Sequence, residues 1–573
     1  MAENYYRDNP DLKFHLIHRD LSEAVSLREH GFSQAQEFPE APESFEDALD
    51  SYDKVLDMVG EICGDLIAPR AESVDLEGPK LENGVVTYAS GTQENLKNMA
   101  QAQLMGVMLP RRFNGLNMPV TLYTMMTEMV SRADASLQNL FGLQDIAETI
   151  SKFANEDQKA RYLPRFASGE VDGAMALTEP EAGSDLQAVQ LKARLDPATG
   201  QWYLNGMKRF ITNGCAKVHL VLARSEEGSK DGRGLSMFVC ERGPRLIVRR
   251  IENKLGIHGS PTCELQFNDV PAELVGQRRR GLTRYVMSLM NGARVAISGQ
   301  ALGLAEAAYR EALAYARARE QFGKTIDKFP AVYEMLVNSK VQIAAARTML
   351  YETTKYVDLR DLYEEWVEKG EGVTDEVRQK SKFYNKVAAE LTPLVKAMTT
   401  EIANKVAYDG IQVHGGTGFM RDFKAERFYR DARITNIYEG TTQLQYVAAI
   451  GGVLLRVMDP ILNDLSHLKY EGKLRRLASS VDMACAKLHL AADYVTRRDD
   501  TEYHDLMAGR LCDAETIVYV SYLMLRDALQ DRTRESLVER YVMDWIPRAE
   551  QACDIVLRGD MSMIDQHQAI LAM

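Results

Sequence analysis

The sequence predicts a mainly α-helical protein that carries a β domain in its middle. Apolar residues recur every three or four positions in segments such as 44–74, which is the spacing of an amphipathic helix. Near residue 173 the pattern changes to short apolar runs, such as Val218–Ala223 and Leu235–Cys240, separated by clusters of turn residues. Long helical periodicity resumes at Gly281 and continues through the rest of the chain. We therefore expect helical, antiparallel β and helical segments in that order.

These changes along the chain divide it into five expected segments. They are an N-terminal arm at 1–40, an N-terminal helical domain at 41–172, a middle β domain at 173–281, a C-terminal helical bundle at 282–455 and a helical extension at 456–573. A chain of 573 residues exceeds a single hydrophobic core, so several domains are expected from length alone. The order of the segments says little about chemistry by itself.

The composition is typical of a soluble globular protein and limits the partners that it can have. A net charge of −13 argues against nucleic acid and anionic membranes as general partners, since both require a positive surface. Residues 1–14 lack the apolar core of a signal peptide, and no apolar run reaches the roughly 18 residues of a membrane span. The seven cysteines show no metal-binding spacing, so we interpret them as free thiols in a reducing compartment. We expect a cytoplasmic protein without a metal site.

Four motifs contain the residue types of a binding site. The segment 175-MALTEPEAGSD-185 resembles a strand followed by a turn whose N–H groups and hydroxyls could approach a ring or a phosphate closely, and 205-NGMKRFITNG-214 repeats this design. The segments 317-RAREQFGKTI-326 and 411-IQVHGGTGF-419 flank a pair of expected helices, and the second resembles a phosphate-binding glycine loop. Taken singly, each motif is also compatible with an ordinary structural turn.

Glu439 lies in 429-YRDARITNIYEGTTQLQ-445, where the pattern predicts a loop that leads into a buried helix at 443–458. Thr441 and Thr442 are candidate N-caps of that helix. Glu439 could itself be the cap, because a helix N-terminus stabilises a carboxylate. From these residues alone a structural role and a chemical role both remain open.

Together, and in this order, the motifs resemble the acyl-CoA dehydrogenase family of flavoenzymes. The resemblance covers roughly residues 50–450 and includes KLGIHGSPTCEL at 254–265. It implies an N-terminal helical domain, an antiparallel β-barrel-like middle domain and a C-terminal four-helix bundle, with a helical extension in larger members. It also implies an FAD cofactor and an acyl-CoA substrate.

Carried over residue by residue, the resemblance implies a role for each matching position. Glu439 corresponds to the catalytic base. The cofactor-binding positions are Leu177, Thr178, Gly183, Ser184, Phe210, Thr212, Arg319, Gln321, Phe322, Gln412, Gly415, Gly416, Thr441 and Gln443. Those from Arg319 to Gly416 correspond to residues that contact the FAD of a neighbouring subunit. The substrate-binding positions are Ser184, Asn291, Arg294, Tyr438 and Gly440, and Arg294 corresponds to the arginine that binds CoA.

Some members of the family carry the base on an earlier helix, one or two residues before the CoA-binding arginine. Those positions are Gly292 and Ala293 here, and neither side chain can abstract a proton, so the resemblance assigns the base to Glu439. The implied reaction is α,β-dehydrogenation to a 2-enoyl-CoA, in which Glu439 takes the α-proton and N5 of FAD accepts the β-hydride. The electrons are expected to pass to an electron-transfer flavoprotein.

Two rival functions share part of this pattern. An acyl-CoA oxidase would carry the same residues but would let oxygen reach the reduced flavin. Relatives that bind nucleic acid form a second class, and such binding needs a basic surface. Acidic residues outnumber basic residues across 460–573, which argues against this second class.

The extension resembles that of larger family members, in which it covers a surface that shorter members use to form tetramers. We therefore expect a homodimer. A membrane-interface helix at 514–529 is the alternative, but few basic residues flank it. The basic run Arg278, Arg279 and Arg280 could either contact CoA phosphates or form a solvated face.

Overall fold

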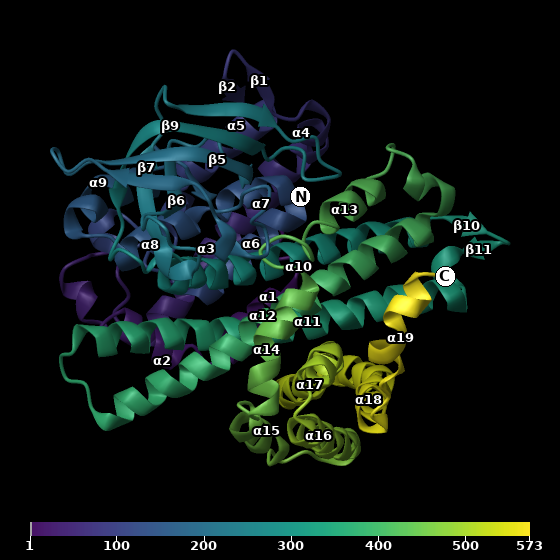
Figure 1. Ribbon diagram of the computed structural model, residues 1–573. Coiled ribbons are helices and arrows are strands. Elements are labelled where there is room, and N and C mark those ends of the chain that lie inside the picture. Colours follow the sequence, from purple (N-terminus) through teal and green to yellow (C-terminus); the bar gives the residue numbers. More distant parts are fainter. Residues whose placement is uncertain (1–2) are drawn as a thin grey trace. The chain divides into compact units, whose positions relative to one another are not determined.

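The computed structural model describes residues 3–573 and divides into two compact units (Figure 1). Unit 1 contains the residues up to Asn9 together with Phe32–Leu304, and unit 2 contains Pro10–Gly31 together with Ala305–Met573. The helix α10 (Met287–Ala318) contributes its first part to unit 1 and its second part to unit 2.

Three of the seven described helices of unit 1 that precede its large sheet, α3, α7 and α9, begin at side chains that cap them. Ser44 accepts the N–H of Asp47 at the start of α3, and Asn155 and Gln158 form a reciprocal capping box at α9. These helices are α3 (Phe45–Glu61), α4 (Ala71–Glu77), α5 (Ser90–Gln101), α6 (Val120–Ala133), α7 (Ala135–Phe141), α8 (Gln144–Phe153) and α9 (Glu156–Ala167). A small hairpin, β1 (Lys80–Glu82) and β2 (Val85–Thr87), lies between α4 and α5.

The large sheet of unit 1 closes on itself like a barrel. Its strands are β3 (Gly173–Ala176), β4 (Lys192–Leu195), β5 (Trp202–Thr212), β6 (Val218–Arg224), β7 (Leu235–Glu241), β8 (Leu246–Ile251) and β9 (Thr262–Leu274). Pairing runs through β6, β4, β5, β9 and β7 and returns from β7 to β6. The sheet is mixed rather than purely antiparallel, because β6 pairs in parallel with both β3 and β4.

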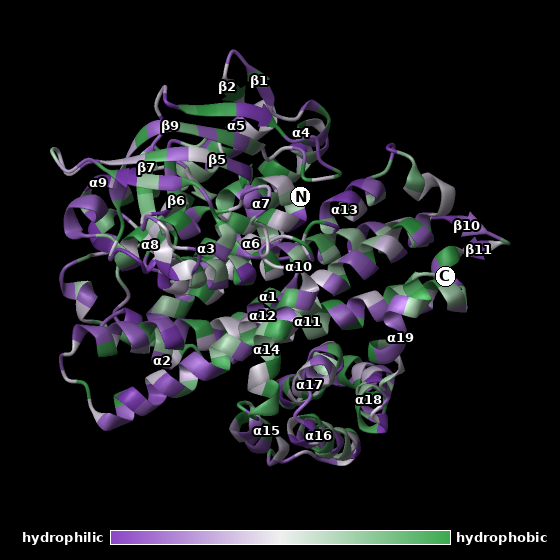
Figure 2. Ribbon diagram, in the orientation of Figure 1, coloured by the Kyte–Doolittle hydropathy of each residue, from purple (hydrophilic) through white to green (hydrophobic). Residues whose placement is uncertain are grey.

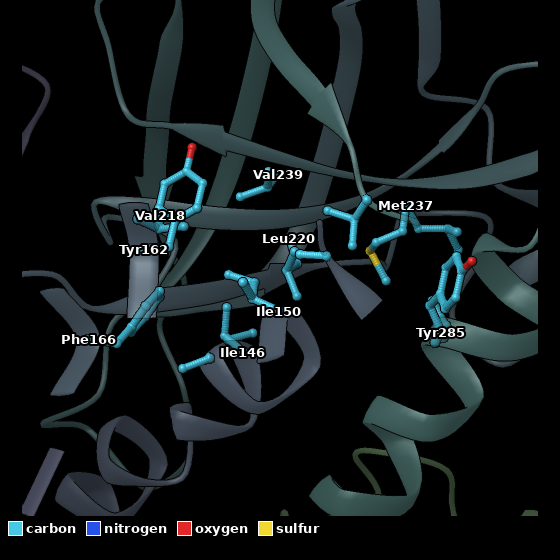
Figure 3. Packing of buried hydrophobic residues seen from close by; sticks show 14 of the residues in the cluster. Ile146, Ile150, Tyr162, Phe166, Val218, Leu220, Met237, Val239 and Tyr285 are labelled. Carbon is cyan, nitrogen blue, oxygen red and sulfur yellow. The ribbon is translucent and has the colours of Figure 1, made fainter. Parts of the chain in front are cut away.

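The strands β6 and β7 are buried on both faces, which explains their uninterrupted apolar sequences. Val218 and Leu220 of β6 and Met237 and Val239 of β7 pack against Ile146, Ile150, Tyr162 and Phe166 of α8 and α9, as Figure 3 shows. The alternate residues Val221 and Phe238 point to the other face and join the core inside the sheet. Side chains of a strand alternate between its faces, so a strand covered on both sides is apolar throughout.

Unit 2 is almost entirely helical. Its long helices α11 (Pro330–Lys369) and α12 (Asp375–His414) pack side by side (Figure 1) and show alternating hydrophilic and hydrophobic ribbon (Figure 2), as expected of helices with one buried face. The remaining elements are α1 (Pro10–His18), α2 (Ser22–Arg28), β10 (Glu320–Gln321), β11 (Lys324–Thr325), α13 (Ala425–Ala432), α14 (Thr442–Leu454), α15 (Asp459–Ser466), α16 (Gly472–Arg498), α17 (Thr501–Gln530), α18 (Glu535–Arg558) and α19 (Ser562–Leu571).

A buried ionic network joins the N-terminal segment of unit 2 to the extension. Arg19 next to α1 lies 2.5 Å from Asp527 of α17 and 3.3 Å from Glu352 of α11, and all three side chains are buried. Asp11 of α1 likewise lies 2.9 Å from Arg347 and 2.7 Å from Arg534. Because unpaired buried charges are costly, these pairs require α1, α11 and the extension to fold together.

The extension packs around α17, whose residues 514–525 are all buried. This burial contradicts the alternative that 514–529 is a membrane-interface helix, because its apolar side chains are already covered by protein. Among the described residues no single helix is long and apolar enough to span a membrane, although α14 and α15 together, bent by 71°, pass that test on length and composition.

Candidate active site

In unit 1 a buried lysine of the motif 205–214 forms hydrogen bonds with residues of the motif 175–185. Nζ of Lys208 donates to the carbonyl of Leu177 at 2.7 Å and to Oε1 of Glu179 at 2.9 Å, and the N–H of Arg209 donates to the carbonyl of Thr178 at 3.0 Å. Burial lowers the pKa of Lys208 to about 8. The structure thus holds Leu177 and Thr178 against β5.

The turn that follows Thr178 presents Gly183 and Ser184 to solvent. Glu179 and Ala182 close this turn with reciprocal backbone hydrogen bonds of 3.1 and 3.2 Å. A Cβ added at Gly183 would meet nothing within 4 Å, so the backbone here is open to a ligand. The arrangement agrees with the sequence-based expectation of a turn with accessible N–H and hydroxyl groups.

Phe210 is presented outward by an irregularity in β5. The register of β5 against β9 shifts between Lys208 and Ile211, and Phe210 adopts the left-handed conformation with φ of +61°. Bulges of this kind re-aim a side chain. The ring remains 51% exposed and is covered on one side by the guanidinium of Arg209, 4.7 Å from its centre. Thr212 follows at the end of the strand, half-buried and paired with Thr262.

The candidate CoA-binding residues lie on the part of α10 that belongs to unit 1. Nη1 of the buried Arg294 donates to Oδ1 of Asn291 at 3.2 Å. A Cβ at the intervening Gly292 would lie 3.7 Å from the carboxylate of Asp145, a buried residue of α8. Sequence reasoning missed Asp145, which places an acidic group beside the position where some family members carry their base.

In unit 2, Glu439 lies in the loop before α14 and does not cap that helix. The N-cap is Thr441, whose hydroxyl accepts the N–H of Leu444 at 3.4 Å. Glu439 has the left-handed φ of +52°, and Gly440 follows with φ of +92°. The interpretation of Glu439 as a helix cap is therefore wrong.

The side chains of α12 hold this loop at several points. Nζ of Lys396 donates to the carbonyl of Gly440 at 2.7 Å, and Glu401 accepts from the hydroxyl of Thr442 at 2.6 Å and from Nδ2 of Asn436 at 3.0 Å. From α14 itself, Nε2 of Gln445 donates to the carbonyls of Gly440 and Glu439 at 2.8 and 3.2 Å.

The remaining predicted cofactor residues of unit 2 lie at one end of its bundle and are exposed. Tyr315 of α10 stacks on His414 of α12 with ring centres 4.3 Å apart, and the hydroxyl of Thr417 donates to that of Tyr315 at 3.1 Å. These contacts bring two segments to the same end of the bundle, one with Arg319, Gln321 and Phe322 and one with Gln412, Gly415 and Gly416. Phe322 is 94% exposed.

Each unit by itself offers groups of the kinds that bind parts of a flavin dinucleotide. Unit 1 offers an exposed aromatic face at Phe210, the hydroxyls of Thr178 and Thr212, and an open turn at Gly183. Unit 2 offers the guanidinium of Arg319 and a glycine turn at Gly415, where an added Cβ would meet nothing within 4 Å. A planar ring needs such a face, and phosphates need N–H groups and guanidinium.

Sequence reasoning did not identify the buried lysines that support the site. Lys208 and Lys396 are both fully buried and both donate to carbonyls of predicted site residues. Each lies within an otherwise ordinary strand or helix pattern, and a lysine there is more often exposed. The signal that could have found Lys396 is its place on the apolar face of α12.

Comparisons with known proteins identify the family of the chain. Models of the N-terminal, middle and C-terminal domains of acyl-CoA dehydrogenase match residues 50–170, 174–270, and 280–367 with 376–450. The 3-methylmercaptopropionyl-CoA dehydrogenase of Ruegeria pomeroyi is 34% identical over 71% of this chain and 71% of its own length.

Two solved structures are similar in fold. Butyryl-CoA dehydrogenase from Megasphaera elsdenii, 29% identical, covers 71% of this chain and 98% of its own chain with a TM-score of 0.60. Acyl-CoA dehydrogenase complexed with FAD from Bacillus anthracis, 23% identical, covers 89% of this chain and 88% of its own chain with a TM-score of 0.76, so the similarity of fold extends into the C-terminal extension. The chain belongs to the acyl-CoA dehydrogenase family of enzymes and is an oxidoreductase that acts on acyl-CoA.

Proposed function

We propose that this enzyme oxidises the Cα–Cβ bond of an acyl-CoA thioester to the 2-enoyl-CoA and that Glu439 is the base. The observation that carries the proposal is the conformation of Glu439, a carboxylate held with a left-handed backbone in a loop whose helix cap is a different residue. Strained residues of this kind occur preferentially at functional sites.

Different residues of the chain have different roles in the proposed reaction. Glu439 removes a proton from the α-carbon, while FAD supplies the acceptor for the hydride that leaves the β-carbon. Arg294 and Asn291, together with Ser184, Tyr438 and Gly440, bind the CoA thioester. Closure of the site around the acyl chain excludes water and so strengthens hydrogen bonds to the thioester oxygen.

FAD is the cofactor, and it is held by the residues that form its ring face and phosphate contacts. These are Leu177, Thr178, Gly183, Ser184, Phe210, Thr212, Thr441 and Gln443, with Arg319, Gln321, Phe322, Gln412, Gly415 and Gly416 reaching the FAD of a second subunit. The protein is a cytoplasmic homodimer of fatty-acid β-oxidation, and its two electrons pass to an electron-transfer flavoprotein.

An anaerobic titration tests this function. Purified protein with bound FAD is titrated with short, long, branched and cyclic acyl-CoAs, and with CoA lacking an acyl group as the control. We expect loss of flavin absorbance and stoichiometric 2-enoyl-CoA with at least one thioester. Peroxide formed in step with turnover in air would instead identify an acyl-CoA oxidase, and no bleaching by any thioester would contradict the proposal.

A further inference from the structure

The backbone around Glu439 is in a conformation that needs external support. A left-handed φ is unfavourable for a residue with a Cβ by roughly 1–2 kcal/mol, because Cβ approaches the following carbonyl. Glu439 and Gly440 have φ of +52° and +92° in succession. Such a segment persists only where its surroundings determine it, so the groups that bind its carbonyls help to hold the backbone from which the Glu439 side chain projects.

Two donors converge on those carbonyls. The ammonium of Lys396 and the amide of Gln445 both bind the carbonyl oxygen of Gly440, at 2.7 and 2.8 Å, and Gln445 also reaches the carbonyl of Glu439. Both side chains are fully buried. A charge-assisted hydrogen bond is about twice as strong as a neutral one, so Lys396 is the stronger support.

Burying an ammonium is costly, and an apolar residue would fill the same space on α12 without that cost. The neighbouring buried position Thr399 shows the contrast, since its hydroxyl donates to carbonyls of its own helix, those of Val395 at 2.8 Å and Lys396 at 3.4 Å. The charge of Lys396 is instead directed at the loop of Glu439. A positive charge at this place also favours the ionised form of a nearby carboxylate.

We propose that Lys396, assisted by Gln445, is a positioning residue for Glu439 that orients its carboxylate and keeps it ionised and ready to accept a proton. This inference rests on the proposed function, in which Glu439 is the base. Lys396 touches the backbone of the loop and not the reacting atoms, so it acts through Glu439.

The test compares three variants of the full-length protein loaded with FAD. Lys396→Met removes the charge and the donor at nearly constant volume, Gln445→Met removes the neutral donor and keeps the charge, and Thr399→Val is the matched control on α12. Measurements are FAD content, the anaerobic rate of flavin bleaching by the best acyl-CoA as a function of pH, and hydrogen–deuterium exchange of the peptide that contains residues 436–445.

For Lys396→Met we expect full FAD content, faster exchange in the 436–445 peptide and bleaching that is slower by roughly 10- to 100-fold, the cost of a misplaced catalytic group. The acidic limb of the pH–rate profile should shift to higher pH. Gln445→Met should slow bleaching less than Lys396→Met does and should leave the pH–rate profile unchanged, because the ammonium of Lys396 is still present. Thr399→Val should match the wild type in every measurement.

The inference would be overturned if Lys396→Met had the same bleaching rate, pH–rate profile and hydrogen exchange as the wild type. A fall in rate without any shift in pH profile would reduce Lys396 to a structural support, which also contradicts the proposal. If Lys396→Met does not fold, Gln445→Met still tests the inference. Hydrogen exchange and bleaching at the wild-type rates in Gln445→Met would show that the carbonyl contacts do not position Glu439. Bleaching that survives in Glu439→Gln would contradict the proposed function itself, which is a separate outcome.

Discussion

At the scale of single residues, two adjacent glycines of α14 differ sharply in their surroundings. A Cβ at Gly452 would meet Oε2 of Glu390 well inside van der Waals contact, whereas a Cβ at Gly451 would meet nothing within 4 Å. Glu390 is buried on α12. Gly452 therefore permits the close approach of α14 to α12, and Gly451 has no such role.

Alanine substitutions at these two positions form a matched pair. Gly452→Ala should lower the free energy of unfolding by about 1–3 kcal/mol, the usual cost of overpacking a core. Gly451→Ala should be neutral or stabilise the protein by up to about 1 kcal/mol, because alanine favours a helix. Urea denaturation followed by circular dichroism measures both, and equal effects in the two variants would show that α14 does not pack closely against Glu390.

At the scale of elements, a pair of buried carboxyl groups joins the extension to the bundle. Glu390 of α12 and Glu515 of α17 lie together and are almost fully buried, and burial raises the pKa of both groups above the ordinary value. The charge of Asp459, at the start of α15, raises the pKa of each further. The two carboxyls therefore retain protons in the folded protein that an unfolded chain would release.

This pair should make stability depend on pH. Above an unfolded pKa of about 4.5 the unfolded chain binds fewer protons than the folded one, so stability falls as pH rises through the folded pKa of each group. Glu515→Gln removes one of these groups at constant shape, and we expect a flatter decline of stability as pH rises above the ordinary glutamate pKa and a higher urea midpoint at the alkaline end of the series. Glu365→Gln, whose carboxylate is exposed on α11, is the control. An unchanged slope in Glu515→Gln would mean that the pair does not titrate as a buried unit.

The elements also show which parts of the fold the sequence could predict. The strands β6 and β7 were predicted because both of their faces are buried and their sequences are apolar throughout. The strands β4 and β8 were missed, since each buries only one face and β8 carries exposed Arg249 and Arg250. The helix predicted at 443–458 was expected to be well buried, yet Val447 is 59% exposed because α14 packs on one face only. An uninterrupted apolar run identifies a strand that is covered on both faces, whereas a short strand covered on one face gives a weaker signal.

At the scale of the whole molecule, pairings between distant parts of the chain could not be predicted. Arg19 and Asp527 are far apart in sequence but form a buried ion pair in unit 2. The parallel pairing of β3 with β6 likewise depends on the topology of the sheet. The expected domain boundaries and the expected homodimer both stay predictions. Light scattering after gel filtration checks the dimer, with an expected mass of twice 64.4 kDa, and a mass of four chains would contradict it.

The residues of the candidate site were predictable to the extent that they lie in motifs. Glu439, Phe210 and Arg294 were assigned through the resemblance of the chain to the family, and their roles stay predictions. Lys396 and Asp145 were not found, because their roles depend on the carbonyl or the glycine that another element brings to them. Arg278 was left open between a CoA contact and a solvated face, and it forms an ion pair of 2.8 Å with Glu226.

The central claim is that Glu439 is the base, and Glu439→Gln tests it most directly. The variant is isosteric and uncharged, so FAD should remain bound and the protein should stay yellow. Under anaerobic conditions an acyl-CoA that bleaches the wild type should leave the flavin absorbance of this variant unchanged over the same time, or at least slow its loss by a factor of about 10² or more. Glu365→Gln controls for the loss of a carboxylate elsewhere on unit 2.

One result with Glu439→Gln would contradict the central claim. If Glu439→Gln is bleached by acyl-CoA at the wild-type rate with FAD bound, then Glu439 does not remove the α-proton. The carboxylate of Asp145, which faces Gly292 on α10, would then be the next candidate for that role.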